Sequence, residues 1–149
     1  MEENSNILYQ TMIPIEPRTK KNSLEIKFRR VPNLKGFFRK TKFGFEYCGI
    51  PFVAQSEDYK QYEKDCIFFL NPRPKEPIAE KVNVKCIFYR RTNRIVDLSN
   101  LENAILDILV KYRVIADDNF NVVCSMDGSR VLVDKEHPRT EITIERITE

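Results

Sequence analysis

The sequence contains a single histidine, His137, and no two cysteines at the close spacing of a metal-binding pair. A histidine-based catalytic triad or metal site therefore has too few residues to form. Cys48, Cys66, Cys86 and Cys124 are far apart in the chain, and without paired spacing a zinc site is not expected. We expect four free thiols, buried or half-buried, in a reducing cytosol.

No run of about 18 apolar residues is present, so the sequence predicts no membrane span. The first residues, Met1-Glu2-Glu3-Asn4, are acidic and polar, unlike a signal or transit peptide, and we expect a cytoplasmic protein. The chain has no repeats and no low-complexity tract. Its 149 residues, 42% hydrophobic and 32% charged, predict one globular domain covering residues 1–149.

The net charge is only +3, but its distribution along the chain is uneven. From Arg18 to Lys42 there are ten basic residues and one acidic residue, Glu25, which leaves this segment at +9. Such an excess predicts a region that contacts phosphates. Five aromatic side chains are interleaved with it: Phe28, Phe37, Phe38, Phe43 and Phe45. They could stack on bases or form the inward side of strands, and the sequence leaves both interpretations open.

Hydrophobic periodicity predicts strands at residues 7–13, 24–30, 47–53, 81–89, 122–125, 131–133 and 140–147. Residues 31–45 are expected to be irregular. One helix is predicted to begin after Ser56 as N-cap and to end at Asn71-Pro72, and a second runs from about Asn100 to Tyr112. The fold class is therefore α/β or α+β, with a mixed β-sheet of four to six strands and two main helices.

Acidic residues surround the second helix. Asp97 precedes it, Asp107 lies on it, and Asp117-Asp118 follows in the next loop. Mg²⁺ binds oxygen ligands and prefers one or two carboxylates together with water and phosphate. With the basic segment, these carboxylates predict a metal-dependent nuclease. The alternative is that they are helix-capping and turn residues.

The stretch from Asp97 to Asp118 resembles the RusA family of Holliday junction resolvases, found largely in phages and prophages. The family pattern is Asp-x-Asp-Asn-x-x-Lys, a helix with an internal Asp, and then Asp-Asp. Here it reads Asp97-Leu98-Ser99-Asn100-Leu101-Glu102-Asn103, then Asp107, then Asp117-Asp118. Further landmarks of the family lie at residues 17–23, 59–63 and 138–142.

The resemblance implies a RusA-like fold and a homodimer that binds four-way DNA junctions. It would use Mg²⁺ or Mn²⁺ to hydrolyse one phosphodiester in each of two opposed strands, in the cytoplasm of a bacterial or phage-infected cell. By resemblance, Asp97 and Asp118 are metal ligands, with Asp117 as a close supporting carboxylate. Asn100 and Asp107 are motif members with a supporting role, and Asp107 joins Asp97, Asp117 and Asp118 as a candidate catalytic residue.

Two positions depart from the family pattern. Ser99 stands where many members have the second Asp, which should weaken metal binding. Asn103 stands where many have a Lys, which removes one source of transition-state stabilisation. Ser99 and Glu102 fit a capping box, with Ser99 as N-cap and Glu102 three residues later. A direct role of these two residues at the metal is the alternative.

Six basic residues are candidates for holding backbone phosphates, which positions DNA without reading its sequence: Arg18, Lys20, Lys21, Arg90, Arg91 and Arg94. Two other functions remain open. The chain could be a junction-binding module that kept the fold and lost catalysis through Ser99 and Asn103. It could also bind or cleave RNA.

Overall fold

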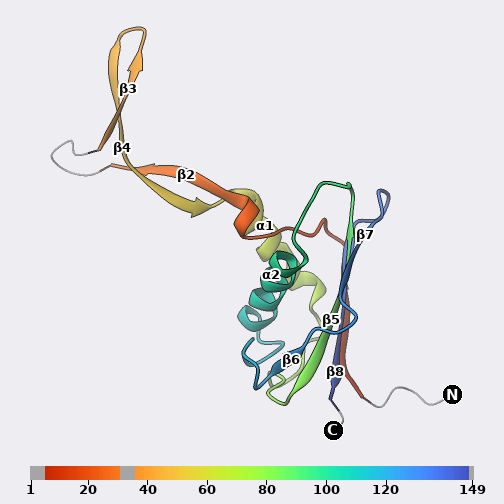
Figure 1. Cartoon of the computed structure of the whole chain (residues 1–149). Coiled ribbons are helices and arrows are strands. Elements are labelled where there is room, and N and C mark those ends of the chain that lie inside the picture. Colours follow the sequence, from red (N-terminus) through yellow and green to blue (C-terminus); the bar gives the residue numbers. More distant parts are fainter. Residues whose placement is uncertain (1–5, 31–35, 148–149) are drawn as a thin grey trace.

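A computed structural model describes residues 6–30 and 36–147 (Figure 1). Five strands form one mixed sheet in the order β1-β8-β5-β6, with β7 also paired to β5. Strand β8 is antiparallel to both β1 and β5, whereas β6 and β7 run parallel to β5. The strands are β1 (Ile7–Ile13), β5 (Val82–Arg90), β6 (Val123–Ser125), β7 (Arg130–Val133) and β8 (Arg139–Arg146). The mixed sheet and the α+β class confirm the fold predicted from the sequence.

Two helices, α1 (Glu57–Cys66) and α2 (Leu98–Lys111), cover one face of this sheet (Figure 1). Short 3-10 helices lie at η1 (Lys21–Ser23) and η3 (Ile67–Phe69). Every second residue of β5, from Val82 to Phe88, is buried, as the period of two in a strand requires. These side chains pack in one core cluster with the apolar stripe of α2, and their burial is the main source of stability.

Helix α1 begins as predicted. The Ser56 hydroxyl accepts a hydrogen bond of 3.2 Å from the backbone N–H of Tyr59, and Glu57 and Asp58 follow in the first turn. There they interact favourably with the positive end of the helix dipole. Further along the helix, Tyr59 and Tyr62 are buried in the core.

The predicted capping box of α2 is wrong. The N-cap is Asp97, whose backbone is extended and whose carbonyl accepts from the N–H groups of Asn100 and Leu101 at 3.1 and 3.3 Å. The helix therefore begins at Leu98, and Ser99 and Glu102 lie inside it. The Asp97 side chain makes no capping bond, because its carboxylate accepts from the Asn100 side chain instead.

A three-stranded arm projects from the body of the protein (Figure 1). It consists of β2 (Leu24–Arg29), β3 (Phe37–Thr41) and β4 (Gly44–Gln55), in the order β2-β4-β3. The prediction of an irregular segment at residues 31–45 was therefore wrong where the structure describes it, and residues 31–35 lie outside the described residues. Strand β4 is also much longer than the predicted strand at residues 47–53.

Gly49 is the point at which β4 changes partner. Pairing with β2 ends at Arg29 opposite Ile50, and pairing with β3 begins at Phe37 opposite Gly49. Gly49 has a φ of +97°, and a Cβ there would lie 2.5 Å from the Arg29 carbonyl oxygen. Only glycine permits both this backbone conformation and this close approach, so Gly49 sets the bend of the arm.

Two further predictions concern the thiols and the membrane. All four cysteines are free. Cys66 and Cys86 are buried and Cys48 is half-buried, but Cys124 is exposed, so the expectation of burial was wrong for this residue. Burial raises the pKa of the Cys66 thiol to about 12. Across the described ranges, 6–30 and 36–147, we find no helix with the length and hydrophobicity needed to cross a bilayer.

Candidate functional site

Asp97 is held at the start of α2 by a neighbour one turn further along the helix. The Asn100 side-chain amide donates a hydrogen bond of 3.0 Å to Asp97 Oδ2. Asn100 is only 9% exposed, so its side chain is fixed by the surrounding core. One Asp97 oxygen is thereby oriented, while the residue itself remains exposed.

Asp107 lies on the same helix and is paired with a residue from a distant segment. Lys20 Nζ donates to Asp107 Oδ2, and both side chains are about 40% exposed, at 41% and 38%. Lys20 immediately precedes η1 at the base of the arm. The pair therefore joins the root of the arm to the middle of α2, and it places a cation beside one of the predicted site carboxylates.

Asp117 closes the turn that follows α2. Its two carboxylate oxygens accept hydrogen bonds of 2.7 Å from the backbone N–H of Asp118 and from the side-chain amide of Asn119. Hydrogen bonds to the charged form favour ionisation, and the bond from the Asp118 N–H is the main reason that the pKa of Asp117 is lowered.

Asp118 has the opposite electrostatic environment. Partial burial raises the pKa of its carboxyl group, and the adjacent Asp117 and the charge of Asp107 raise it further. A bound cation would relieve the repulsion that the Asp118 carboxylate experiences from these two neighbouring charges. The structure thus brings Asp107, Asp117 and Asp118 into one electrostatic group.

Asp97 stands at the other end of the helix. It precedes Asp107 by ten residues, which corresponds to about 15 Å along a helix axis. Within residues 6–30 and 36–147, no three His, Cys, Asp or Glu side chains lie close enough together to hold a metal ion. The all-oxygen donors around Asp118 fit a hydrated Mg²⁺, which needs only one or two carboxylates. Metal binding by Asp97, Asp117 and Asp118 stays a prediction.

Ser99 and Asn103, which depart from the family pattern, and the nearby Glu102 lie in different surroundings on α2. Ser99 and Asn103 are exposed, whereas Glu102 is half-buried. Burial raises the pKa of Glu102. Burial also raises the pKa of the Cys86 thiol in β5, and the charge of Glu102 raises it further. Glu102 therefore lies toward the sheet, and Asp107 toward Lys20. No observation tests a direct role of Ser99 or Glu102 at a metal.

Three of the predicted phosphate contacts line one cavity beside the start of α2. Its volume is about 350 Å³, and its lining includes Arg18, Arg90 and Arg94 together with Glu16 and Val96. Arg91 lines an adjoining cavity of about 420 Å³ with the same arginines. Residues separated by more than 70 positions in the sequence thus form one basic surface next to Asp97.

Glu16 organises this arginine surface. Its carboxylate accepts from the backbone N–H of Arg91 at 2.9 Å and lies 3.9 Å from Arg90 Nε, which is buried and has no hydrogen-bond partner in the structure. Arg18 is 3.7 Å from Asp58. Arg91 and Arg94 form no ion pair with any described residue, so their charge is available to an anion.

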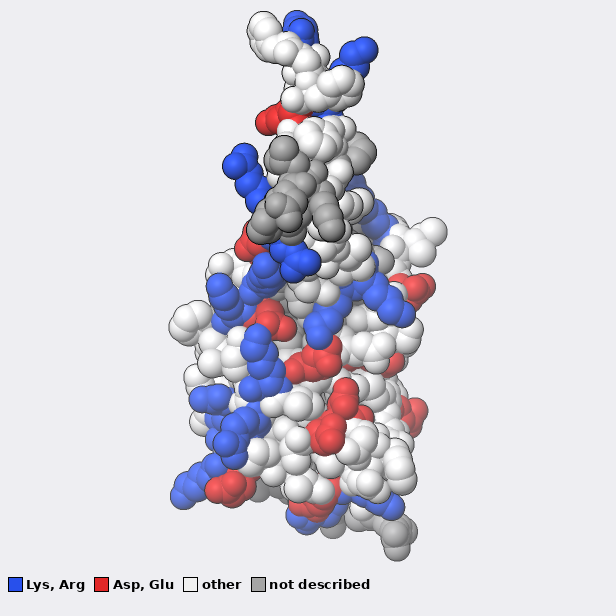
Figure 2. Space-filling view, turned by 90° about the vertical axis from the view of Figure 1, so that its left-hand side faces the viewer, with Lys and Arg blue, Asp and Glu red and all other residues white. Residues whose placement is uncertain are grey.

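Lys20 and Lys21 do not line these cavities. Lys20 is paired with Asp107, and Lys21 is exposed at the first position of η1. Figure 2 shows Lys and Arg side chains at the top of the arm and along one side of the viewed face, with acidic side chains beside them. The body thus carries an arginine surface, formed by Arg18, Arg90, Arg91 and Arg94, and the arm carries a separate set of basic side chains.

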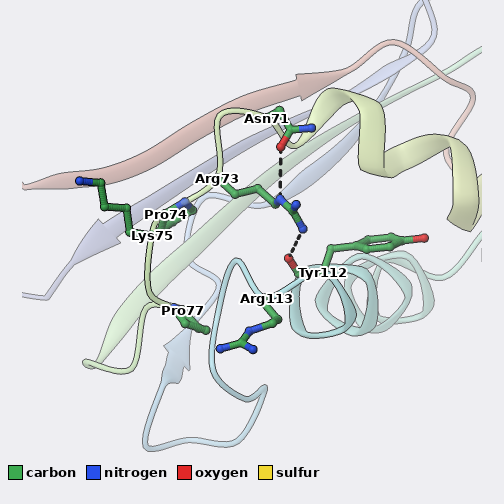
Figure 3. Close-up of a pocket in the computed structure, with 7 residues that line it drawn as sticks. All are labelled: Asn71, Arg73, Pro74, Lys75, Pro77, Tyr112 and Arg113. Atoms are coloured by element: carbon green, nitrogen blue, oxygen red, sulfur yellow. Dashed lines mark hydrogen bonds between the residues drawn. The ribbon is translucent and has the colours of Figure 1, made fainter.

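Another cavity, of about 330 Å³, lies at the opposite end of α2 (Figure 3). Arg73 donates to the Tyr112 carbonyl at 3.0 Å and to Asn71 Oδ1 at 3.2 Å. A guanidinium on a terminal carbonyl satisfies an acceptor that the helix leaves open. None of the predicted site residues lines this cavity. Among its lining residues, Arg73 caps the C-terminal end of α2.

Sequence reasoning missed Glu16 and the pairing of Lys20 with Asp107. Glu16 is 75 positions from the Arg91 N–H that it accepts from, and Lys20 is 87 positions from Asp107. No local pattern predicts such contacts. The one available signal was charge balance, because Glu16 is the acidic residue nearest the start of the basic segment.

Comparison with known proteins agrees with this geometry. The family model described as Endodeoxyribonuclease RusA matches residues 40–145, which is more than half of the 149 residues. No curated protein matches the chain. Arg18, Lys20 and Lys21 precede the matched range, whereas Asp97, the acidic turn and the remaining arginines lie within it. The chain therefore belongs to the RusA family of endodeoxyribonucleases, which resolve Holliday junctions.

Proposed function

We propose that this protein resolves four-way or branched DNA by metal-dependent hydrolysis of one phosphodiester in each of two opposed strands. The observation that carries the proposal is the arrangement along α2. An arginine-lined cavity adjoins the first turn beside Asp97, whereas Asp107 lies on the same helix and Asp117 and Asp118 lie in the turn that follows it. One end offers cations to a phosphate backbone, and the other gathers negative charge that a divalent cation would neutralise.

The proposed ligands of Mg²⁺ or Mn²⁺ are Asp117 and Asp118 in the turn after α2, together with Asp97 at the start of the helix, which lies apart from them in this structure. When bound, the metal would activate water and polarise a phosphoryl oxygen, chemistry that needs no histidine and no covalent nucleophile. The chain orients the ligands: Asn100 holds one oxygen of Asp97, and the Asp117 turn fixes the backbone of Asp118. A bound cation would favour the charged form of Asp118, whose pKa is raised by partial burial.

The arginine surface would position the DNA. Arg91 and Arg94, which have no acidic partner among the described residues, supply charge for backbone phosphates, and such contacts position DNA without reading its sequence. A junction with two opposed cuts also requires two sites related by symmetry. A C2 homodimer provides them as two copies of one site, and we propose that assembly, acting in the cytoplasm of a bacterial or phage-infected cell.

A second candidate is a junction-binding protein without catalysis. Two observations favour it: Ser99 and Asn103 replace a carboxylate and a cation of the family pattern, and no described group of three acidic side chains forms a metal site. It would keep the arginine surface and bind branched DNA without cutting it. The two candidates differ only in the fate of the phosphodiester, so one assay separates them.

That assay is cleavage of a synthetic four-way DNA junction in Mg²⁺ and in Mn²⁺, with linear duplex as a control substrate. Junction cleavage is expected to fall at least about 100-fold in Asp118→Asn, because a ligand of the catalytic metal is lost. Asp127→Asn, an exposed aspartate in the turn before β7, is the matched control and should cut normally. Tight binding by the wild-type protein with no product in either metal would establish the second candidate.

A further inference from the structure

The tip of the arm presents aromatic rings to solvent. Strands β3 and β4 are joined at Lys42 and Phe43, and in Figure 1 this end stands clear of the helices and the five-stranded sheet. Phe43 is 100% exposed and Phe45 is 74% exposed. Burying a phenylalanine ring against a partner is favourable by the hydrophobic effect, so two such rings at a projecting end indicate a contact surface.

The turn holds Phe43 in this exposed position. The backbone N–H of Phe43 donates to Thr41 Oγ1 at 3.2 Å, and the Thr41 hydroxyl donates to the Gly44 carbonyl at 3.2 Å. Gly44, with a φ of +124°, supplies the backbone conformation that closes the turn. The ring is therefore carried by a hydrogen-bonded turn, and little further ordering is needed when it meets a partner.

Cations accompany the rings. Lys40 lies directly opposite Phe45 in the antiparallel pair, so the two side chains share one face, and Lys42 precedes Phe43. Neither lysine forms an ion pair with a described residue, whereas Arg39 is paired with Glu46 at 2.6 Å. A surface that combines unpaired cations with exposed rings is complementary in charge to a polyanion with flat apolar faces. Nucleic acid with accessible bases has that chemistry.

We propose that Phe43 stacks on an unstacked base at the branch point of a DNA substrate, while Lys40 and Lys42 contact the adjacent phosphates. In a linear duplex the bases already stack on each other, and inserting a ring first requires unstacking them. At a branch point, continuous stacking is interrupted. The tip would therefore favour branched over linear DNA, a selectivity that the arginine surface, which meets only phosphates, does not supply. This inference rests on the proposed function.

The test compares Phe43→Ala and Phe43→Trp with the wild-type protein. Affinity is measured for a four-way junction carrying 2-aminopurine at the branch point and for a linear duplex of the same sequence. Stacking on one base predicts that Phe43→Ala binds the junction about tenfold more weakly, with a much smaller change for the duplex. Phe43→Trp should restore binding, and quenching of 2-aminopurine should disappear only in Phe43→Ala. Phe68→Ala, which removes a 73% exposed ring of η3, is the matched control and should behave as wild type.

Unchanged junction affinity in Phe43→Ala, or an equal loss on junction and duplex, would overturn the inference. A change in sedimentation with unchanged junction affinity would instead assign the tip to contact with a second copy of the chain, and would also overturn it. Junction cleavage in Mg²⁺ is recorded on the same proteins. If the wild-type protein cleaves the junction and Phe43→Ala shows no selective loss of junction binding, only this inference is contradicted. If the wild-type protein neither binds nor cleaves the junction, the proposed function is contradicted as well.

Discussion

Lys20 Nζ donates to the carboxylate of Asp107 across 87 positions of sequence. Partial burial raises the pKa of Asp118, and the charge of Asp107 adds to that rise. The base of the arm and the acidic group beside α2 are therefore electrostatically linked. Substituting either Lys20 or Asp107 therefore changes the electrostatic potential at Asp118 while leaving Asp118 itself in place.

This link predicts a change in the pH profile of cleavage. The raised pKa of Asp118 means that the carboxylate is lost to protonation as pH falls through that value, so cleavage should decline on the acid side. Asp107→Asn removes a negative charge, lowers the pKa of Asp118 and moves the acid limb to lower pH. Lys20→Ala removes the compensating cation and moves it to higher pH. Single-turnover cleavage rates across the acid range measure both, and acid limbs that coincide with wild type in both variants would contradict the link.

Asn100 is predicted to position Asp97 for metal binding. Asn100→Ala removes the 3.0 Å hydrogen bond to Asp97 Oδ2 and should weaken Mn²⁺ binding by about 10–100-fold, as is typical when the group that orients a ligand is lost. Titration calorimetry with Mn²⁺ measures this. Asn103→Ala, an exposed change one turn away, is the control and should leave the affinity intact. Equal affinities in Asn100→Ala and wild type would exclude Asp97 as an oriented ligand.

The arginine surface is predicted to contact backbone phosphate. Arg94→Ala should weaken binding to junction and duplex alike and reduce the slope of log affinity against log salt by about 1, the value for one phosphate contact. Arg146→Ala is the matched control, because Arg146 is already paired with Glu80 at 2.6 Å. A salt slope in Arg94→Ala that equals the wild-type slope would place the DNA elsewhere.

The bend of the arm depends on Gly49. Gly49→Ala combines an unfavourable φ with a 2.5 Å approach to the Arg29 carbonyl, whereas Gly44→Ala has an unfavourable φ of +124° and no atom within 4 Å. Gly49→Ala should therefore destabilise the arm more, with a backbone strain of about 1–3 kcal/mol plus the cost of the clash. Hydrogen–deuterium exchange over β2, β3 and β4 reports this difference, and equal protection in the two variants would show that the close approach has no structural effect.

The elements of the body could be predicted because their signals are local. The alternation along β5, the Ser56 cap and the apolar stripe of α2 each identify an element without knowledge of the rest of the fold. The start of α2 was misplaced because Ser99-x-x-Glu102 matches a capping box as well as Asp97 matches an N-cap. Only the backbone conformation at Asp97 distinguishes the two.

Two strands of the arm were predicted, at residues 24–30 and 47–53, and the first is confirmed as β2 (Leu24–Arg29). Strand β3 and the full length of β4 could not be predicted, because these strands are stabilised by pairing with each other. Phe38 faces Tyr47, with ring centroids 5.2 Å apart, and Lys40 faces Phe45, so neither strand has the alternation of a half-buried strand. The acidic candidates were identified as residues, but their grouping was not. The chain turns back after α2 and brings Asp118 near enough to Asp107 for their charges to interact. Asp97, in contrast, lies beside the arginine surface.

The central claim is paired hydrolysis of branched DNA, and cleavage of a supercoiled plasmid that extrudes a cruciform tests it most directly. Two opposed cuts within one complex convert the plasmid to linear DNA, whereas a single cut gives a nicked circle. The proposed function predicts linear product in Mg²⁺ or Mn²⁺ without prior accumulation of nicked circles, and no linear product in Asp118→Asn. Plasmid that is bound but stays supercoiled in both metals would contradict the claim and leave a protein that only binds junctions.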